Sequence, residues 1–336
     1  MAHRPTLVSL AKDLGVSRQT VSNAINRPEV VAPETLERVL AAIEQTNYRP
    51  MRAARQLRTK NSRTIAVRIM PEYDGISGHI LNHFNHQLAQ TAGEFQYRMI
   101  TFVARDNGDE VASYAEMFND GDIDGVILSS TTLGDERPAR LLELGIPFVS
   151  FGRPWGTYDD GQQAPFSWVD VDCAAGTSEA TRALMDAGHR RIGYLSWPIV
   201  PGIGKDRYEG WAATMEDAGL DVSGLVEISE DHALGLATSA RLLIDRGATA
   251  IVCASDSLAL GALPVCQASG AALIGFDGTP VARALAMNSV EQPVGDVAIT
   301  AFHMLFDVMQ DRTAVRHTLL TPQLVLRNRL DVEPVF

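Results

Sequence analysis

Five polar residues that could contact DNA lie within six positions near the amino terminus: Arg18, Gln19, Thr20, Ser22 and Asn23. An arginine can form two parallel hydrogen bonds to guanine, and glutamine or asparagine can do the same to adenine. The hydroxyls of Thr20 and Ser22 can reach phosphates. This set of side chains is typical of a helix that lies in a DNA major groove.

Two short helices joined at Gly15 would position these side chains. Ser17 stands where an N-cap would satisfy the free amides of the second helix. A third helix, from Pro33 to about Thr46, would close a three-helix core. The alternative is an ordinary pair of surface helices. The apolar residues expected to face inward are Leu7, Leu10, Ala11, Val21, Ala24, Ile25, Leu36, Val39, Leu40 and Ile43.

Residues 51–58 form a helix-capable segment with three arginines, among them Arg55, and a protruding Leu57. Eight residues hardly hold a helix in isolation. We expect the segment to order on DNA, where arginines bind phosphates and an apolar wedge opens a minor-groove step. The alternative is a plain charged linker.

The charge distribution separates the two ends of the chain. Residues 1–60 contain ten Lys and Arg and five Asp and Glu, for a net charge of +5, whereas all 336 residues carry −12. The remainder is therefore at −17. A basic end attracts a polyanion, and an acidic body limits non-specific binding to DNA. With no apolar stretch long enough to span a membrane and no export signal, we expect a cytoplasmic protein.

Apolar segments alternate with helical patterns from Arg63 onward, which predicts an α/β body of two doubly wound parallel-sheet lobes. The first set of expected strands is 64–69, 97–103, 125–129 and 148–151, with helices at 80–93, 111–119 and 138–144. The second set of strands is 168–171, 191–195, 226–229, 250–253 and 273–276, with helices at 174–187, 206–218, 233–246 and 257–268.

Ligands of such folds bind beyond the carboxyl ends of the strands, and the residues there are polar or aromatic. Carboxylates and a guanidinium suit paired hydroxyls, and an aromatic face such as that of Trp197 covers a sugar ring. Asp170, Asp172 and Asp256 serve equally well as helix caps or loop residues. The candidates are Tyr73, Asp74, Ser129, Ser130, Arg153, Asp170, Asp172, Trp197, Arg207, Ser255, Asp256 and Asp277.

The chain resembles the LacI/GalR (lactose repressor) family of bacterial transcription regulators over essentially its full length. The resemblance is carried by the amino-terminal module, the proline-led segment with Ala-Arg-Gln-Leu, and a series of body motifs. Those motifs are Asp124-Gly-Val-Ile-Leu, Ile146-Pro, Ala187-Gly-His-Arg-Arg-Ile-Gly, Arg207-Tyr-Glu-Gly-Trp, Ala254-Ser-Asp-Ser-Leu-Ala-Leu-Gly, Ile274-Gly-Phe-Asp and Glu291-Gln-Pro.

The resemblance implies a homodimer that binds a palindromic DNA operator, and a periplasmic-binding-protein-like (type I) core that closes on a small effector, expected to be a sugar. It assigns base reading to Arg18, Gln19 and Asn23, and effector anchoring to Arg207 and Asp277. Ser129 and Ser255 stand where members often have another polar ligand. Phosphate contacts are implied for Thr6, Ser17, Thr20, Ser22 and Asn26, and the hinge-helix wedge for Leu57.

The implied domains are a helix-turn-helix headpiece (1–49), a hinge (50–62), an N-terminal lobe (63–164 plus 293–321) and a C-terminal lobe (165–292 plus 322–336). Three features depart from the family pattern. Gly152 replaces a usual aspartate, so that Arg153 or Trp155 would substitute; Gly278 replaces a second aspartate; and the chain is shortened between Gly261 and Ile274. The sign of effector control, induction or co-repression, stays open.

Other functions fit the sequence less well. An enzyme fused to a DNA-binding module would need a phosphate loop, a nucleophile elbow, a metal-spaced cluster or an acid/base pair, and we identify none. We therefore expect no catalytic residue, metal or cofactor. A transport-type sugar-binding protein would not need the basic amino-terminal segment, residues 1–60. A nucleobase, a nucleoside or another metabolite remains an alternative effector.

Overall fold

The computed structural model describes residues 5–46, 48, 61–69, 78–156, 158, 164–200, 202–230, 235–312 and 314–331. The chain divides into two compact units, residues 1–62 and 63–336. The expected helix at 51–58, with Arg55 and Leu57, lies outside the described residues, as do Tyr73 and Asp74.

The smaller unit is a helical module with a core of its own. Leu10, Ala11, Val21, Ala24 and Val39 are buried at its centre. Leu40, which we expected in this core, is 47% exposed, because its neighbour Val39 takes the inward position on the helix. The elements are α1 (Leu7–Leu14), α2 (Arg18–Asn26), the short 3₁₀ helix η1 (Pro28–Val30) and α3 (Pro33–Thr46).

The larger unit contains two six-stranded sheets. In the first sheet all neighbouring strands are parallel, in the order β11-β5-β4-β3-β1-β2. Alternate residues of β1 face opposite sides: Ile65 and Val67 pack in one buried cluster and Ala66 in another. The strands are β1 (Thr64–Arg68), β2 (Arg98–Phe102), β3 (Gly125–Leu128), β4 (Phe148–Phe151), β5 (Trp168–Val171) and β11 (His317–Leu320).

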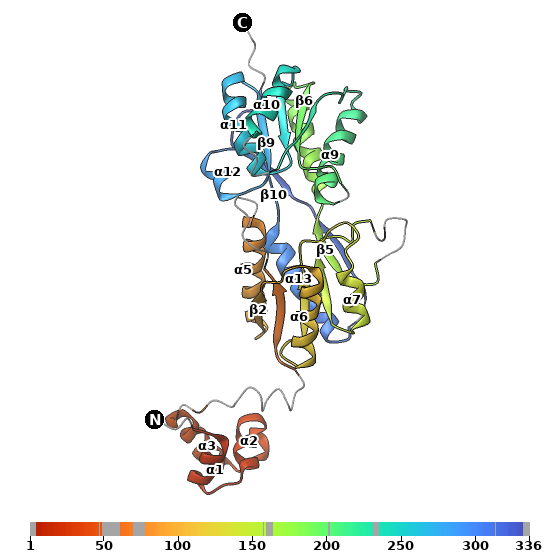
Figure 1. Ribbon diagram of the computed structural model, residues 1–336. Helices are drawn as coiled ribbons and strands as arrows, with labels where there is room; N and C mark the ends of the chain where they lie inside the picture. The colour runs from red at the N-terminus through yellow and green to blue at the C-terminus, as the bar shows by residue number, and fades with distance from the viewer. Residues whose placement is uncertain are drawn as a thin grey trace. The chain divides into compact units, whose positions relative to one another are not determined.

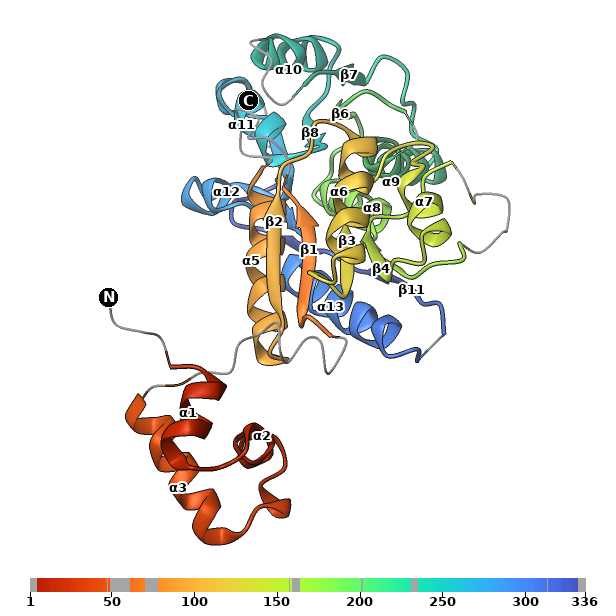
Figure 2. The ribbon, with the colours of Figure 1, turned by 60° about the horizontal axis from the view of Figure 1, so that its bottom comes forward.

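Helices cover both faces of the first sheet (Figure 2). On the side of Ile65 and Val67, Phe84 of α5 and Phe302 of α13 join the core. On the side of Ala66, Tyr114 of α6 and Leu141 of α7 do so. The helices are α5 (Gly78–Glu94), α6 (Asn107–Asn119), α7 (Arg137–Glu143) and α13 (Val294–Met309).

The second sheet has the order β12-β10-β9-β8-β6-β7 and is parallel except for β12, which runs antiparallel to β10. Helices α8 and α9 pack against each other, as do α10 and α11. The elements are β6 (Ile192–Ser196), β7 (Val226–Ile228), β8 (Ala250–Cys253), β9 (Ala272–Asp277), β10 (Asn288–Glu291), β12 (Gln323–Val325), α8 (Cys173–Asp186), α9 (Ile203–Asp217), α10 (Leu236–Asp245), α11 (Asp256–Ser269) and α12 (Pro280–Ala284).

The chain passes between the two sheets three times: after β5, after β10 and after β11 (Figure 1). The expectation that residues 168–171 open the second set of strands was wrong. They form β5, which pairs with β4 and β11 in the first sheet. The sequence shows where a strand lies but not which neighbours it pairs with, and β5 comes directly before the first passage.

All nine expected strands from 64 to 276 are confirmed, with ends that differ by at most one residue, and the expected helices between them are found with ends that differ by up to four residues. Helices α12 and α13 and strands β10 and β11 were not predicted from the hydrophobic pattern. Within the described residues no helix is long and apolar enough to cross a membrane.

Candidate functional site

The outer face of α2 carries most of the polar side chains that we expected to contact DNA. Arg18 and Gln19 are exposed, and Ser22 and Asn23 are partly exposed, whereas Val21 and Ala24 are buried on the opposite face. Gln19 Nε2 donates to Asn23 Oδ1 at 2.9 Å, so these two side chains are aligned along one face of the helix.

Ser17 and Thr6 cap the two helices of this module. The Ser17 hydroxyl oxygen accepts from the amide of Thr20 at 3.0 Å, which confirms the expected N-cap of α2. Thr6 caps α1 and exchanges hydrogen bonds with Ser9 in a capping box. Gly15 has φ +66°, a left-handed conformation that suits glycine, and turns the chain between the helices.

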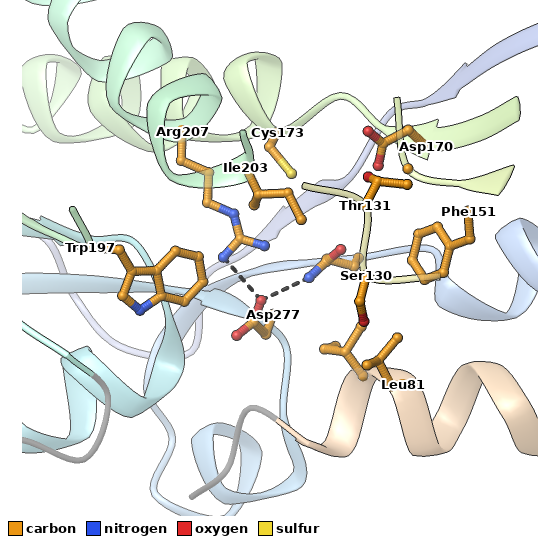
Figure 3. Close-up of a pocket in the computed structure, with 13 residues that line it drawn as sticks. Leu81, Ser130, Thr131, Phe151, Asp170, Cys173, Trp197, Ile203, Arg207 and Asp277 are labelled. Carbon is orange, nitrogen blue, oxygen red and sulfur yellow. Dashed lines mark hydrogen bonds and ion pairs between the residues drawn. The ribbon is translucent and has the colours of Figure 1, made fainter. Parts of the chain in front are cut away.

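The larger unit contains a cavity of about 180 Å³ between the carboxyl ends of its two sheets (Figure 3). Elements of both sheets contribute to the lining, which combines apolar side chains with a few polar groups, as ligand pockets usually do. The lining residues are Ile80, Leu81, Ser130, Thr131, Phe151, Gly152, Asp170, Cys173, Trp197, Ile203, Arg207, Asp277 and Gln292.

Arg207 and Asp277 form a buried ion pair in this cavity. Arg207 Nη1 lies 3.2 Å from Asp277 Oδ1, and the two side chains are 3% and 6% exposed. Gln292 Nε2 donates to the same carboxylate oxygen at 2.8 Å. The Arg207 guanidinium lies 5.0 Å from the ring centre of Trp197 and 3.8 Å from that of Phe276. The guanidinium is thereby fixed in both position and orientation.

A second ion-pair cluster lies at the edge of the cavity and connects the two lobes. Arg153 follows β4 of the first sheet, and its Nε lies 3.0 Å from Asp170 Oδ2. Its Nη2 lies 2.6 Å from Asp206 Oδ2, on α9 of the second lobe. Arg153 is not among the cavity-lining residues; its partner Asp170 is.

Burial is the largest influence on the pKa of three cavity residues, Asp170, Cys173 and Arg207. It raises the pKa of Asp170, and the nearby charge of Arg153 offsets only part of this effect. It also raises the pKa of Cys173 to about 12. For Arg207, burial lowers the pKa, but neighbouring groups, among them the Asp277 carboxylate, outweigh it and the pKa is raised, so the guanidinium stays charged. The Cys173 thiol is neutral at pH 7 and is no nucleophile.

The structure brings together Trp197, Arg207 and Asp277 in the cavity, as expected, but not Ser129 and Ser255. Ser129 is buried behind the cavity wall, where its carbonyl accepts from Arg137 at 3.0 Å. Ser255 is fully buried and caps α11, accepting from the amide of Leu258 at 3.1 Å. Ser129 directly follows β3 and Ser255 comes two residues after β8, but neither residue lines the cavity.

From the sequence, Asp170, Asp172 and Asp256 could each be a ligand-binding residue or a helix cap or loop residue, and the structure shows a different role for each. Asp170 lines the cavity. Asp172 caps α8 by accepting from the amide of Ala175 at 3.0 Å. Asp256 does not cap α11; its carboxylate accepts from the amide and hydroxyl of Thr279 and from the hydroxyl of Ser289. It thus ties the turn after Asp277 to β10.

Steric reasons account for both glycines that depart from the family pattern. A Cβ on Gly152, at φ +119°, would stand 2.2 Å from Thr131 Oγ1. A Cβ on Gly278, at φ +68°, would stand 2.5 Å from Glu291 Cγ. The shortened stretch between Gly261 and Ile274 ends α11 at Ser269 and begins β9 at Ala272, and none of its residues lines the cavity.

Several lining residues were not found by the sequence analysis. Phe151 stands at the end of an expected strand, so the strand-end rule could have found it. Gln292 follows β10, a strand that we did not predict. Ile80, Leu81 and Ile203 are apolar residues on helices, which sequence patterns do not distinguish from core positions. In the described part of the chain, no group of three His, Cys, Asp or Glu residues is arranged to hold a metal ion.

Each of the two units matches a family of known proteins. Residues 6–51 match the bacterial regulatory proteins of the lacI family. Residues 82–324 match the family described as periplasmic binding proteins and sugar binding domain of LacI family.

Similar proteins include the HTH-type transcriptional regulator CelR of Thermobifida fusca, 33% identical over 310 residues (86% of this chain and 87% of CelR). A structure titled transcriptional regulator CelR–cellobiose complex is 28% identical with a TM-score of 0.68 and covers 96% of this chain and 99% of that one. A Lac repressor dimer bound to operator and the anti-inducer ONPF shares the fold, with a TM-score of 0.81 at 21% identity, covering 97% of this chain and 98% of that one. The chain therefore belongs to the LacI family of DNA-binding transcriptional regulators.

Proposed function

We propose that the chain is a repressor of carbohydrate metabolism genes whose operator binding responds to a small neutral sugar in the cavity between its lobes. The observation that carries this proposal is the fixed polar end of the cavity, where Arg207, Asp277 and Gln292 form one hydrogen-bonded group beside the ring of Trp197. Such a group can bind paired hydroxyls while the indole covers the apolar face of a sugar ring.

The charges around the cavity favour a neutral ligand. The two guanidiniums of Arg153 and Arg207 face the three carboxylates of Asp170, Asp206 and Asp277. All of these charges are already paired within the protein, so a phosphate or carboxylate on the ligand would meet no uncompensated cation. A neutral sugar fits this balance better than a sugar phosphate or a sugar acid.

We assign operator contacts to the module at residues 1–49: base contacts to Arg18, Gln19 and Asn23, and phosphate contacts to Thr6, Ser17, Thr20, Ser22 and Asn26. We also propose that residues 50–62 are the hinge, with Arg55 on phosphate and Leu57 as the minor-groove wedge, and that two chains form the dimer that a palindromic operator requires. The proposed lobe bounds change in one respect, because the first sheet includes β5.

Coupling follows if the sugar and the operator favour different arrangements of the two lobes. The sugar would contact groups of both lobes, since Asp170 belongs to β5 of the first sheet, whereas Asp277 belongs to β9 of the second sheet and Arg207 to α9 of the same lobe. A ligand shifts such an equilibrium only by its differential affinity for the two states, and a coupling of about 1–3 kcal/mol makes a useful switch.

A thermal-shift panel tests the cavity directly. Cellobiose, maltose and glucose are compared with glucose 6-phosphate, glucuronate and hypoxanthine, and operator binding is followed by gel shift with each compound. We expect a neutral sugar to raise the melting temperature and to change operator affinity. Arg207→Ala and Asp277→Ala should keep operator binding and lose this response, whereas Arg246→Ala, at an exposed arginine of the second lobe, should behave as the parent.

Stabilisation by the charged compounds or by hypoxanthine alone would contradict the proposed effector class. Loss of folding in Arg207→Ala and Asp277→Ala, seen as loss of the cooperative melting transition, would assign the ion pair to fold stability. Turnover of any compound in the panel would favour an enzyme.

A further inference from the structure

The loop after β3 forms one wall of the cavity through Ser130 and Thr131. Ser130 has φ +54°, in the left-handed region that residues other than glycine rarely adopt. Such a conformation persists where the surrounding contacts determine it, and it is concentrated at binding sites. The shape of this wall therefore depends on whatever holds Ser130.

Arg137, the first residue of α7, holds this loop from behind. Its Nη2 donates to the carbonyl oxygens of Ser129 and Ser130, at 3.0 and 3.1 Å. The Arg137 side chain is 3% exposed. The guanidinium thus binds the two consecutive carbonyls that lie immediately before Thr131, in a place that water does not reach.

Two buried carboxylates fix the guanidinium itself. Asp135 accepts from Nε at 3.0 Å and from Nη2 at 2.6 Å. Glu110 Oε2, on α6, accepts from Nη1 at 2.8 Å. Glu110 also accepts from Arg68, the last residue of β1, at 2.8 Å. Asp135 and Glu110 are 2% and 1% exposed, so every charge of this cluster is buried and paired.

Gly152 lies next to Thr131 of this loop, and both residues line the cavity. Because a Cβ at position 152 would stand 2.2 Å from Thr131 Oγ1, a side chain at 152 and the present position of Thr131 exclude each other. The Thr131 hydroxyl occupies the space next to position 152. It is a polar group of this wall, and Gly152 itself brings no side chain.

We propose that Arg137 is a positioning residue of the cavity: it holds Ser130 and Thr131 so that their polar groups contact a hydroxyl of the effector on the side where Gly152 supplies none. The assignment rests on the proposed sugar-binding function for the identity of the ligand. The position of the loop does not rest on it, and the two are tested separately.

Arg137→Lys tests the position of the loop without any ligand. Lysine keeps the charge that Glu110 and Asp135 need, but its single nitrogen cannot bind the two carboxylates and both carbonyls as the three guanidinium nitrogens do. Without the bonds to the carbonyls of Ser129 and Ser130 the loop should open more often. We therefore expect the amides of residues 130–132 in the full-length protein to exchange hydrogen roughly tenfold faster, as the loss of the free energy of one hydrogen bond predicts. Amides of β1 and β4 should exchange as in the parent. Arg140→Lys, on the same helix with a side chain 66% exposed, is the matched control.

The second measurement uses cellobiose and maltose as probes in the thermal-shift assay. If either stabilises the parent, Arg137→Lys should weaken that sugar's apparent affinity by roughly tenfold and leave operator binding without sugar unchanged. Thr131→Val, which removes the hydroxyl at constant volume, should weaken it similarly without changing exchange in the loop. If neither sugar stabilises the parent, the proposed function fails while the exchange result still decides the role of Arg137.

Two outcomes would overturn the proposal. The first is parent-like exchange at 130–132 in Arg137→Lys. The second is faster exchange throughout β1 and β4 both in Arg137→Lys and in Asp135→Asn, which keeps the shape of residue 135 but removes its charge. In that case the cluster stabilises the whole lobe and has no specific effect on the cavity.

Discussion

The shape of the cavity wall depends on individual residues. Gly152 and Thr131 show this most clearly, because a side chain at position 152 would need the space that Thr131 fills. Gly152 has φ +119°, and the space that its side chain would fill belongs to Thr131. Any side chain at position 152 is therefore coupled to the conformation of a loop more than twenty residues earlier. A substitution at either position has to be considered together with the other.

Gly152→Ala should lower the stability of the core more than Gly134→Ala. Gly134 has φ +65° and open space around it, so an alanine there adds only backbone strain, about 1 kcal/mol. Alanine at 152 adds the overlap with Thr131, for a total loss of about 2–4 kcal/mol. Urea unfolding of the two variants measures the difference, and equal losses would show that Thr131 moves away at little cost.

Sequence reasoning at this scale succeeded where a side chain has one dominant use. Trp197 follows β6, Asp277 ends β9 and Arg207 lies on α9. All three line the cavity, as expected. Ser129 and Ser255 also lie just after strands but do not line the cavity, because local backbone conformation, which composition does not reveal, decides which residues reach it. Arg137 gave no signal, since a buried arginine that binds carbonyls resembles any surface arginine of a helix.

At the scale of helices and strands, the sequence predicted helix caps and the positions of most strands, but it did not predict which strands pair. Ser17 was recognisable as an N-cap because serine before a helical pattern has a specific hydrogen-bonding role. The pairing of β5 with β11 joins residues almost 150 positions apart, which a local pattern cannot show. Strand β10 was missed because Asn288-Ser-Val-Glu291 contains a single strongly apolar residue.

Ser17→Ala and Ser17→Asp should separate the cap of α2 from contact with the operator. Alanine removes the acceptor for the Thr20 amide and should destabilise the amino-terminal module by about 1 kcal/mol. Aspartate keeps the acceptor and should preserve stability, but its charge opposes a phosphate, so operator affinity should fall further than with alanine. Melting curves and operator titrations at equal salt compare them. Tight operator binding by Ser17→Asp would contradict the phosphate contact.

For the molecule as a whole, charge and fold are divided along the chain. The net charge of +5 on residues 1–60 and −17 on the rest confines attraction for DNA to one end. This division and the α/β alternation were both predictable, because composition and hydrophobic periodicity are properties of the sequence itself. The cavity was predictable in position, at the strand ends, but not in its apolar lining.

Operator binding should depend steeply on ionic strength. Binding by the proposed dimer, which has two basic ends, should release counterions from the operator. With six or more phosphate contacts the affinity should fall about a thousandfold between roughly 50 and 200 mM salt. Titrations by fluorescence anisotropy at four salt concentrations give the slope. Sugar binding should be insensitive to salt over this range, because the charges around the cavity are paired inside the protein. A flat slope for the operator would contradict the phosphate contacts.

The three passages between the sheets affect how the protein folds during synthesis. The first sheet begins at Thr64, but its covering helix α13 and its edge strand β11 are complete only at Met309 and Leu320. The growing polypeptide must therefore leave Ile65 and Val67 without their full cover until nearly all of it has emerged from the ribosome. Neither lobe can be cut out as one continuous fragment, and a ribosome that stops before Val294 would release an incomplete first lobe for the chaperones and proteases of the cell.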